Sequence, residues 1–162
     1  MFKCIALIGM GLIASSIARA VRQCGLAETI EGYTRSRETA TKALELGLAD
    51  TMHRTPESAV AGADLVIFCT PVKTFSALAE HIGPHLKPGA IVSDVGSVKR
   101  HVLSAIAPHI PAGVHFIPGH PLAGTEESGP QAGFAELFTG RWCLLTPPED
   151  ADGDAVTRMR EF

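Results

Sequence analysis

Charged and aromatic side chains are scarce in this chain. Only 19% of its 162 residues are charged and 6% are aromatic, with a single Trp and a single Tyr. The net charge is −3 and Lys and Arg never run longer than a pair, so we expect no nucleic-acid partner. No apolar run approaches the roughly 18–20 residues of a membrane span, and no leader segment precedes the first strand-like run. We therefore expect a soluble, cytoplasmic protein without a membrane partner.

Cysteine is also sparse, and its spacing argues against zinc. The chain has four cysteines and no C-x-x-C pair or finger-like pattern, so we expect no bound metal. Three of the four lie in apolar, strand-like runs, where a free cysteine behaves as a small hydrophobic residue. We predict buried, reduced thiols at Cys4, Cys24, Cys69 and Cys143.

Apolar residues make up 46% of the chain, enough for a packed core. Short apolar runs alternate with segments of helical periodicity. The predicted strands are Lys3–Ile8, Thr29–Tyr33, Ala49–Met52, Asp64–Cys69, Ala90–Val95, Val114–Ile117 and Arg141–Thr146. The predicted helices are Leu12–Cys24, Ser36–Leu46, Val72–Ile82, Val98–Ala107 and Asp154–Phe162. This order predicts an α/β fold, a doubly wound and mostly parallel Rossmann-type sheet with helices on both faces.

The regular alternation breaks down after Gly119. Residues 119–140 are rich in Gly, Pro and small polar residues. A loop of about 20 residues inside a compact domain is unusual and often functional. We therefore expect this segment to contribute to a site.

The last residues of the chain predict a boundary. Pro147–Gly153 has the composition of a linker, and the helix after it is barely two turns long. We expect one domain over residues 1–150 and, in residues 151–162, the start of a linker helix toward a second domain. Met159 and Phe162 would then be exposed and would promote association.

A glycine-rich turn follows the first predicted strand. Its sequence, G-M-G-L-I-A, fits the G-x-G-x-x-G/A pattern between a strand and a helix. The first glycine permits a tight turn, the second removes a side chain that would block a pyrophosphate, and the alanine allows close helix–strand packing. The free N–H groups and the helix dipole favour the pyrophosphate. We predict a dinucleotide site at Gly9, Met10, Gly11, Leu12, Ile13 and Ala14; the alternative is a plain βα turn.

The end of the second predicted strand selects the nucleotide. An NAD site normally places Asp or Glu about 20 residues after the turn, where this chain has the neutral Thr34. Arg35, Ser36 and Arg37 follow, and their guanidinium and hydroxyl groups suit a 2′-phosphate. We therefore predict NADP rather than NAD. The alternative is a solvated helix start, with Glu31 inside the strand as a poor substitute for the ribose carboxylate.

The fourth predicted strand ends in a turn expected to line the same cleft. Ligands of doubly wound sheets bind outside the carboxyl ends of the strands. The alternative is an ordinary βα turn with proline at the first helical position, and both interpretations can hold together. The cofactor-lining residues predicted here are Cys69, Thr70, Pro71 and Val72.

The fifth predicted strand ends in the segment SDVGSVK. Ser97 would be exposed at the mouth of the cleft, where it could cap the following helix, serve as a catalytic hydroxyl beside the cofactor, or do both. Asp94 and Lys99 could orient one another.

His120 is the strongest candidate catalyst among the seven histidines. Pro118, Gly119 and Pro121 surround it, and the prolines restrict its backbone. It follows a predicted strand and faces the same cleft. An imidazole there can take a proton from a substrate hydroxyl while hydride leaves the same carbon.

Four segments together resemble the prephenate/arogenate (cyclohexadienyl) dehydrogenase family of tyrosine biosynthesis. They are GMGLIASSIA, TPV, SDVGSVK and PGHPLAGTEESGPQAGFAELFTGRWCLLTP. They span almost the whole chain in the order and spacing of the family, and the G-H-P-x-A-G-[ST]-E-x-S-G stretch is highly specific. The resemblance implies a nucleotide-binding domain followed by a helical domain that dimerises and completes the substrate site.

The resemblance also implies roles for individual residues. His120 matches the family's catalytic histidine, Ser97 a serine that supports the substrate hydroxyl and the nicotinamide, and Glu126 an acidic residue near the mouth of the substrate site. Members with a small polar residue at the position of Thr34 tend to use NADP. The implied reaction is metal-free oxidative decarboxylation of prephenate or arogenate: hydride goes from ring C4 to the nicotinamide, CO₂ leaves C1, and the ring becomes aromatic.

Two other functions remain open on the residues alone. One is a different two-domain NADP reductase, of the β-hydroxyacid or pyrroline-carboxylate type, which would share the turn and the arginines but not the stretch from His120 to Gly129. The other is an NADP(H)-binding sensor or regulatory module without catalysis. For the dehydrogenase we expect a homodimer through the second domain.

Overall fold

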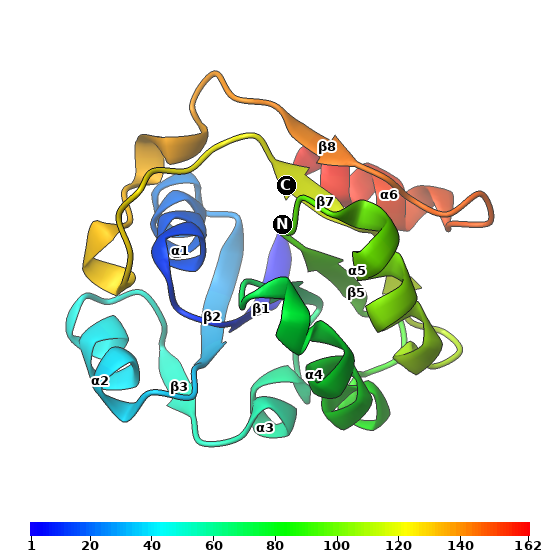
Figure 1. The fold of residues 1–162 in the computed structure, drawn as a ribbon, viewed down its shortest axis with the longest axis horizontal. Helices are drawn as coiled ribbons and strands as arrows, with labels where there is room; N and C mark the ends of the chain where they lie inside the picture. Colours follow the sequence, from blue (N-terminus) through cyan, green and yellow to red (C-terminus); the bar gives the residue numbers. More distant parts are fainter.

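A six-stranded parallel sheet with helices on both faces forms the centre of the computed structural model, which describes residues 1–162 (Figure 1). Its strand order is β3-β2-β1-β4-β5-β6. The strands are β1 (Phe2–Ile8), β2 (Ala27–Tyr33), β3 (Thr51–His53), β4 (Leu65–Phe68), β5 (Ile91–Asp94) and β6 (His115–Phe116). The helices are α1 (Leu12–Cys24), α2 (Arg37–Glu45), α3 (Pro56–Val60), α4 (Phe75–Ile82), α5 (Lys99–Ile106) and α6 (Gly153–Glu161). The predicted Rossmann-type fold is confirmed.

Neighbouring residues of the central strands point into two separate apolar layers. Leu7 and Ile67 pack in the layer beneath α1 and α6, whereas Ile8 and Phe68 pack beneath α3, α4 and α5. All four side chains are 3% exposed or less. Strands buried on both faces have such continuous apolar runs, which is why LVIF reads as a central strand.

The strand order reverses at β1. The chain builds β1, β2 and β3 outward in one direction, then crosses back and places β4 on the other side of β1. Open α/β sheets bind ligands in the crevice outside the carboxyl ends of the strands at such a point. The fold therefore directs attention to the carboxyl ends of β1 and β4.

The segment after Gly119 is more ordered than the predicted loop. Two strands, β7 (Gly119–Pro121) and β8 (Cys143–Leu145), pair antiparallel. The chain between them lies along α1 (Figure 1). A side chain at Gly133 would collide with Ser15, and the Phe134 N–H donates to Ser16 Oγ at 3.2 Å. Small residues on α1 and in the loop therefore allow the two backbones to approach closely.

The terminal helix α6 is docked, so the prediction that Met159 and Phe162 are exposed was wrong. Met159 is 8% exposed and packs in the α1-side layer. The ring of Phe162 meets the edge of Phe2, with centroids 5.8 Å apart, and the Arg158 guanidinium lies 4.7 Å from the centre of the Phe2 ring. These contacts bring the two chain ends together (Figure 1) and stabilise a helix too short to persist alone.

Two local predictions need correction. Helix α3 was not predicted; it begins with Thr55 as N-cap, whose Oγ1 accepts the Ser58 N–H. The helix predicted from Val72 starts as a 3₁₀ turn at Val72–Thr74 and becomes α-helical only at Phe75. Pro71 precedes that turn as its cap and is not the first helical residue.

The cysteines differ from the prediction of four buried thiols. Cys24 and Cys143 are exposed, because one ends α1 at the surface and the other lies in the two-stranded sheet. Cys4 and Cys69 are partly buried, and all four are free. Burial raises the pKa of the Cys69 thiol far above its ordinary range, and the nearby Asp94 charge acts in the same direction.

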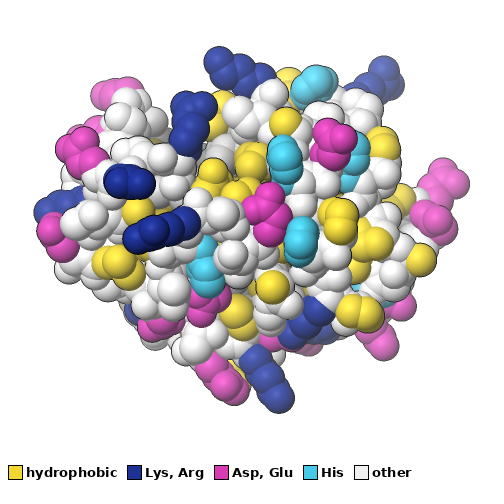
Figure 2. All heavy atoms as spheres, turned by 90° about the horizontal axis from the view of Figure 1, so that it is seen from below, with side chains coloured by type: hydrophobic (Ala, Val, Ile, Leu, Met, Phe, Trp, Pro, Cys, Tyr) yellow, Lys and Arg dark blue, Asp and Glu magenta, His cyan; other side chains and the backbone are white.

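Charges are mixed on the face of the molecule in Figure 2, where basic, acidic and histidine side chains alternate rather than form a field of one sign. No helix combines the length and the apolar character needed to cross a bilayer.

Candidate functional site at the carboxyl edge of the sheet

Gly9 joins the ends of three strands. Its φ is +103°, and a Cβ there would lie 2.8 Å from Thr70 Cγ2 and 2.9 Å from the Cys69 carbonyl carbon. Its N–H donates to the Tyr33 carbonyl at 2.7 Å. Only glycine satisfies both the backbone conformation and this close approach. The turn after β1 is therefore clamped between the ends of β2 and β4.

The start of α1 is open, as a phosphate site requires. Gly11 is the N-cap, it makes no side-chain cap bond, and no heavy atom lies within 4 Å of the position that a Cβ would take. Ala14 is fully buried against the sheet, and Met10 and Leu12 also point into the core. What this segment can offer a ligand is therefore mainly the first backbone N–H groups of α1.

Polar groups follow the end of β2. Arg35 and Arg37 are exposed, and Thr34 is half-buried beside them. Ser36 caps α2, as predicted, by accepting the Thr39 N–H at 3.2 Å. Its hydroxyl proton remains free to donate. The cationic groups therefore stand one strand away from the glycine-rich turn.

Glu31, which lies inside β2, is already engaged. Its Oε2 lies 2.6 Å from His53 Nε2 at the end of β3. This contact agrees with the interpretation of Glu31 as a poor ribose ligand.

The β4 end connects the turn to the next strand. Thr70 Oγ1 lies 2.8 Å from Thr74 Oγ1. A Cβ on Gly96 would lie 3.0 Å from Val72 Cγ2, so the 3₁₀ turn after β4 touches the loop after β5. The sequence analysis missed Thr74, although two threonines one helical turn apart could have indicated the contact.

Ser97 does not cap the next helix, which corrects one of its predicted roles. Asp94 Oδ2 accepts the Gly96 N–H at 2.7 Å in an Asx-type turn. Because this turn comes first, α5 begins only at Lys99, with Val98 in the N-cap position and no side-chain cap bond. Ser97 is exposed, and its hydroxyl remains available to a ligand.

A buried ion pair ties β5 to β7. Lys99 Nζ donates to Asp94 Oδ2 at 2.5 Å and to the Gly119 carbonyl, and the Gly119 N–H donates to Asp94 Oδ1 at 3.3 Å. Burial raises the pKa of Asp94 against the opposing effect of Lys99 and two backbone N–H groups. Burial likewise lowers the pKa of Lys99, against the attraction of Asp94. The predicted orientation of Asp94 and Lys99 by one another is confirmed.

His120 lies on β7 and follows Gly119, the residue to which the ion pair is hydrogen-bonded. It is half-buried, pairs with Leu144 across the two-stranded sheet, and its imidazole makes no hydrogen bond within the chain. The contacts described above thus run from Tyr33 through Gly9 and Thr70 to Gly96 and, through Asp94, to Gly119, the neighbour of His120.

Glu126 is not brought into this arrangement. It is exposed in the segment between β7 and the loop along α1. No hydrogen bond or ion pair connects its side chain to the other predicted site residues, so its role stays a prediction.

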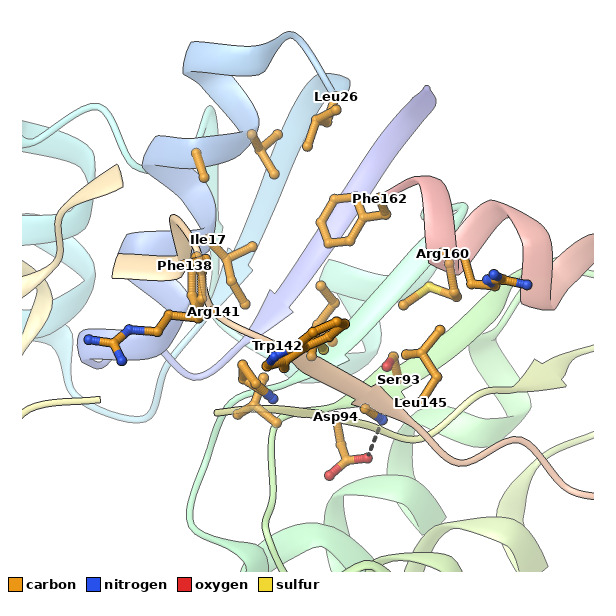
Figure 3. A pocket seen from close by; sticks show the side chains of 18 of the residues that line it. Ile17, Leu26, Ser93, Asp94, Phe138, Arg141, Trp142, Leu145, Arg160 and Phe162 are labelled. Carbon is orange, nitrogen blue, oxygen red and sulfur yellow. Dashed lines mark hydrogen bonds between the residues drawn. The ribbon is translucent and has the colours of Figure 1, made fainter. Parts of the chain in front are cut away.

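A cavity of about 750 Å³ lies behind β7 and β8 (Figure 3). Fifteen of its 23 lining residues are hydrophobic, including Ile17, Trp142 and Phe162. Pro121 lines it but His120 does not, because successive side chains of a strand point to opposite faces. The cavity therefore adjoins Asp94 from the α1 and α6 side, away from the face that carries His120.

Comparison with known proteins identifies the family of this chain. The family described as "Prephenate dehydrogenase, nucleotide-binding domain" matches residues 17–162. The chain belongs to this family. The prephenate dehydrogenase match begins inside α1, just after the glycine-rich turn.

A curated relative extends the similarity over the turn. The cyclohexadienyl dehydrogenase of Zymomonas mobilis is 39% identical over 161 residues, which is 99% of this chain and 55% of that protein. The chain therefore spans about half the length of this curated relative.

Solved structures of prephenate and arogenate dehydrogenases share the fold. A crystal structure of prephenate dehydrogenase from A. aeolicus, in complex with hydroxyphenyl propionate and NAD⁺, superposes with a TM-score of 0.90 at 29% identity and covers 99% of this chain and 56% of that one. The Synechocystis arogenate dehydrogenase has a TM-score of 0.88 at 32% identity and covers 98% and 55%.

Proposed function

We propose that this chain is the nucleotide-binding part of an NADP-dependent dehydrogenase that oxidatively decarboxylates prephenate, arogenate or both. The observation that carries the proposal is the series of contacts that links the glycine-rich turn, through the ends of β4 and β5, to the strand β7 on which His120 lies. Membership of the prephenate dehydrogenase family supports it.

The residues present fit a dinucleotide. Gly9 needs its positive φ and its close approach to Thr70, while the space beside Gly11 is open and the first N–H groups of α1 have no side-chain cap. A pyrophosphate would be held there by these N–H groups and by the positive end of the helix dipole. When bound, the nicotinamide accepts the hydride.

The surroundings of Thr34 favour NADP over NAD. The residue directly after β2 is the neutral Thr34, Glu31 is paired with His53, and Arg35 and Arg37 are exposed. Two guanidinium groups can make charge-assisted bonds to a 2′-phosphate, which a ribose 2′-hydroxyl cannot match.

The remaining chemistry falls to His120 and Ser97. His120 accepts the proton of the substrate hydroxyl as the hydride leaves the same carbon, and Ser97 donates a hydrogen bond that holds this hydroxyl near the nicotinamide. Loss of CO₂ gives an aromatic ring, so the protein needs to supply mainly orientation and one base. Glu126 would lie near the mouth of the substrate site.

The greater length of the relatives supports a larger functional unit. We propose that residues 1–150 form the nucleotide-binding domain, that residues 151–162 lead into a helical domain, and that this domain completes the substrate site and forms a homodimer. Sedimentation of the longest available product of the gene tests the dimer.

Calorimetric titration with NADP and NAD in parallel tests the cofactor. We expect NADP to bind at least about tenfold more tightly, and Arg35→Ala to weaken NADP while leaving NAD unchanged. Arg160→Ala, an exposed arginine on α6, is the matched control. Equal affinities, or a preference for NAD, would contradict the choice of NADP.

Turnover tests the reaction. We expect slow NADPH formation from prephenate or arogenate by this chain, abolished by His120→Asn while NADP still binds. NADP binding with no turnover of either substrate would instead favour a sensor module.

A further inference from the structure

The backbone N–H and carbonyl of Gly119 both form hydrogen bonds with the Asp94–Lys99 ion pair. The Gly119 N–H donates to Asp94 Oδ1, and the Gly119 carbonyl accepts from Lys99 Nζ. These groups belong to the two peptide planes on either side of Gly119. The second plane is the one that joins Gly119 to His120, so the ion pair sets the direction in which the chain enters His120.

The absence of a side chain at Gly119 allows this close contact. A Cβ at Gly119 would lie 3.0 Å from the Asp94 carbonyl oxygen and 3.2 Å from Ser93 Oγ. The backbone of β7 thus lies directly against the end of β5. A Cβ there would require β7 or the end of β5 to shift by a few tenths of an ångström.

The same pair also holds the loop that carries Ser97. Asp94 Oδ2 accepts the Gly96 N–H at 2.7 Å, and Lys99 begins α5 two residues after Ser97. Asp94 and Lys99 therefore hold the backbone both at Gly96, next to Ser97, and at Gly119, next to His120. Neither side chain is among the predicted substrate or nucleotide contacts.

The Asp94–Lys99 pair is not explained by a contribution to the stability of the fold alone. The Asp94 side chain is completely buried and that of Lys99 is 19% exposed. Removing two charges from water costs about as much as their attraction returns, and an apolar pair of the same volume is often as stable. What an apolar pair could not do is satisfy the N–H and the carbonyl of Gly119 together.

We propose that the Asp94–Lys99 pair positions His120 relative to Ser97. The pair acts through Gly119 and Gly96, so both of its members are positioning residues. Its importance for catalysis rests on the function proposed above for His120, but its effect on the His120 geometry does not.

The chain contains a matched control. Lys87 Nζ lies 2.6 Å from Asp64 Oδ1 and also donates to the Gly62 carbonyl at 3.0 Å. It is the same combination of carboxylate and backbone carbonyl as at Lys99. Because Asp64 precedes β4, this second pair lies at the opposite edge of the sheet.

The experiment compares Lys99→Met, Lys99→Arg and Lys87→Met by NMR of the histidine rings and by amide hydrogen exchange. Lys99→Met should shift the ring signals of His120 and accelerate exchange of the Gly119 N–H by at least about tenfold. Lys99→Arg, which can still donate to both acceptors, should restore most of the wild-type signal. Lys87→Met should leave His120 unchanged.

Two results would overturn the proposal: unchanged His120 signals in folded Lys99→Met, or an equal shift in Lys87→Met. If Lys99→Met does not fold, Asp94→Asn is assessed by the same signals, with the same two outcomes. Turnover of His120→Asn separates the two claims. Wild-type turnover there would refute the catalytic role of His120 and leave the positioning result intact.

Discussion

Two aspartate–lysine pairs lie at opposite edges of the same sheet. Asp64 and Lys87 meet at the amino edge at 2.6 Å, and Asp94 and Lys99 meet at the carboxyl edge at 2.5 Å. Each lysine also donates to a backbone carbonyl. Since the chemistry is nearly the same, the two pairs differ mainly in burial and in what they hold.

The pKa values of the two aspartates shift in opposite directions, because the pairs differ in burial. The side chains of Asp64 and Lys87 are 20% and 36% exposed, whereas those of Asp94 and Lys99 are 0% and 19% exposed. Burial alone would raise the pKa of Asp64, but hydrogen bonds from Lys87 and from two backbone N–H groups outweigh it and lower this pKa. At Asp94 burial dominates and raises the pKa.

The comparison shows which edge of the sheet keeps a pair of charges that is unfavourable to bury. The amino-edge pair joins β4 to β1, because Asp64 also accepts the N–H groups of Lys3 and Cys4 at 2.9 Å. The carboxyl-edge pair is more costly and holds the segment that carries His120. The following substitutions test this difference between the edges.

Asp94→Ala should have the largest effect. It leaves the Lys99 ammonium partly buried without its counter-ion and removes the acceptor of two backbone N–H groups, for a loss of about 3–5 kcal/mol. Asp64→Ala should cost about 2 kcal/mol, because its partners can turn to water. Urea unfolding measures both. A smaller loss for Asp94→Ala would contradict the account.

Glycine substitutions should also destabilise the protein more at the carboxyl edge than at the amino edge, by smaller amounts. Gly9→Ala combines a φ of +103° with a contact 2.8 Å from Thr70, and we expect a loss of about 3 kcal/mol. Gly25→Ala, at the amino edge, has a φ of +63° and free space around it, and should cost about 1 kcal/mol. Thermal unfolding provides the comparison, and equal losses would contradict the clamped turn.

Gly11→Ala separates folding from binding at the same turn. Gly11 has a negative φ and open space around it, so the free energy of unfolding should fall only by the difference between Gly and Ala as N-cap, about 1 kcal/mol or less. Its NADP affinity should nevertheless fall, because the methyl group would occupy the pyrophosphate position. Unchanged affinity in calorimetry would place the phosphate elsewhere.

The smallest effect concerns pH at the amino edge. Because the pKa of Asp64 is lowered in the folded protein, its contribution is present above the ordinary value of about 3.9 and is lost as the pH falls below it through the folded-state pKa. The stability difference between wild type and Asp64→Ala should therefore close in acid. Urea unfolding from neutral pH down to about pH 3 follows it, and a constant difference would rule out the assigned pKa direction.

Local patterns were enough to predict most of the central sheet. Helix α1 has the predicted bounds, and Ser36 caps α2 as predicted. Both depend on nearby residues: apolar periodicity with a terminal glycine in one case, and a side chain three residues from its partner in the other. The glycine-rich turn was predictable for the same reason, since φ and side-chain size act locally.

Long-range contacts explain what the sequence analysis missed. Strand β7 pairs with β8 more than twenty residues away, and the docking of α6 depends on Phe2 at the other end of the chain. Ser97 was expected as a possible helix cap, but the Asx turn of Asp94 displaces the start of α5. The proximity of Thr74 and Gly96 to the site likewise follows only from the arrangement of β4 beside β5.

The most direct test of the central claim is a map of the amide NMR shifts of this chain as NADP is added. We predict that the changes concentrate at the carboxyl edge, at Gly11, Ala14, Thr34, Thr70 and Ser97, and spare Asp64 and Lys87. Changes centred on the amino edge, or on the apolar cavity behind β8, would contradict the assignment of the nucleotide site.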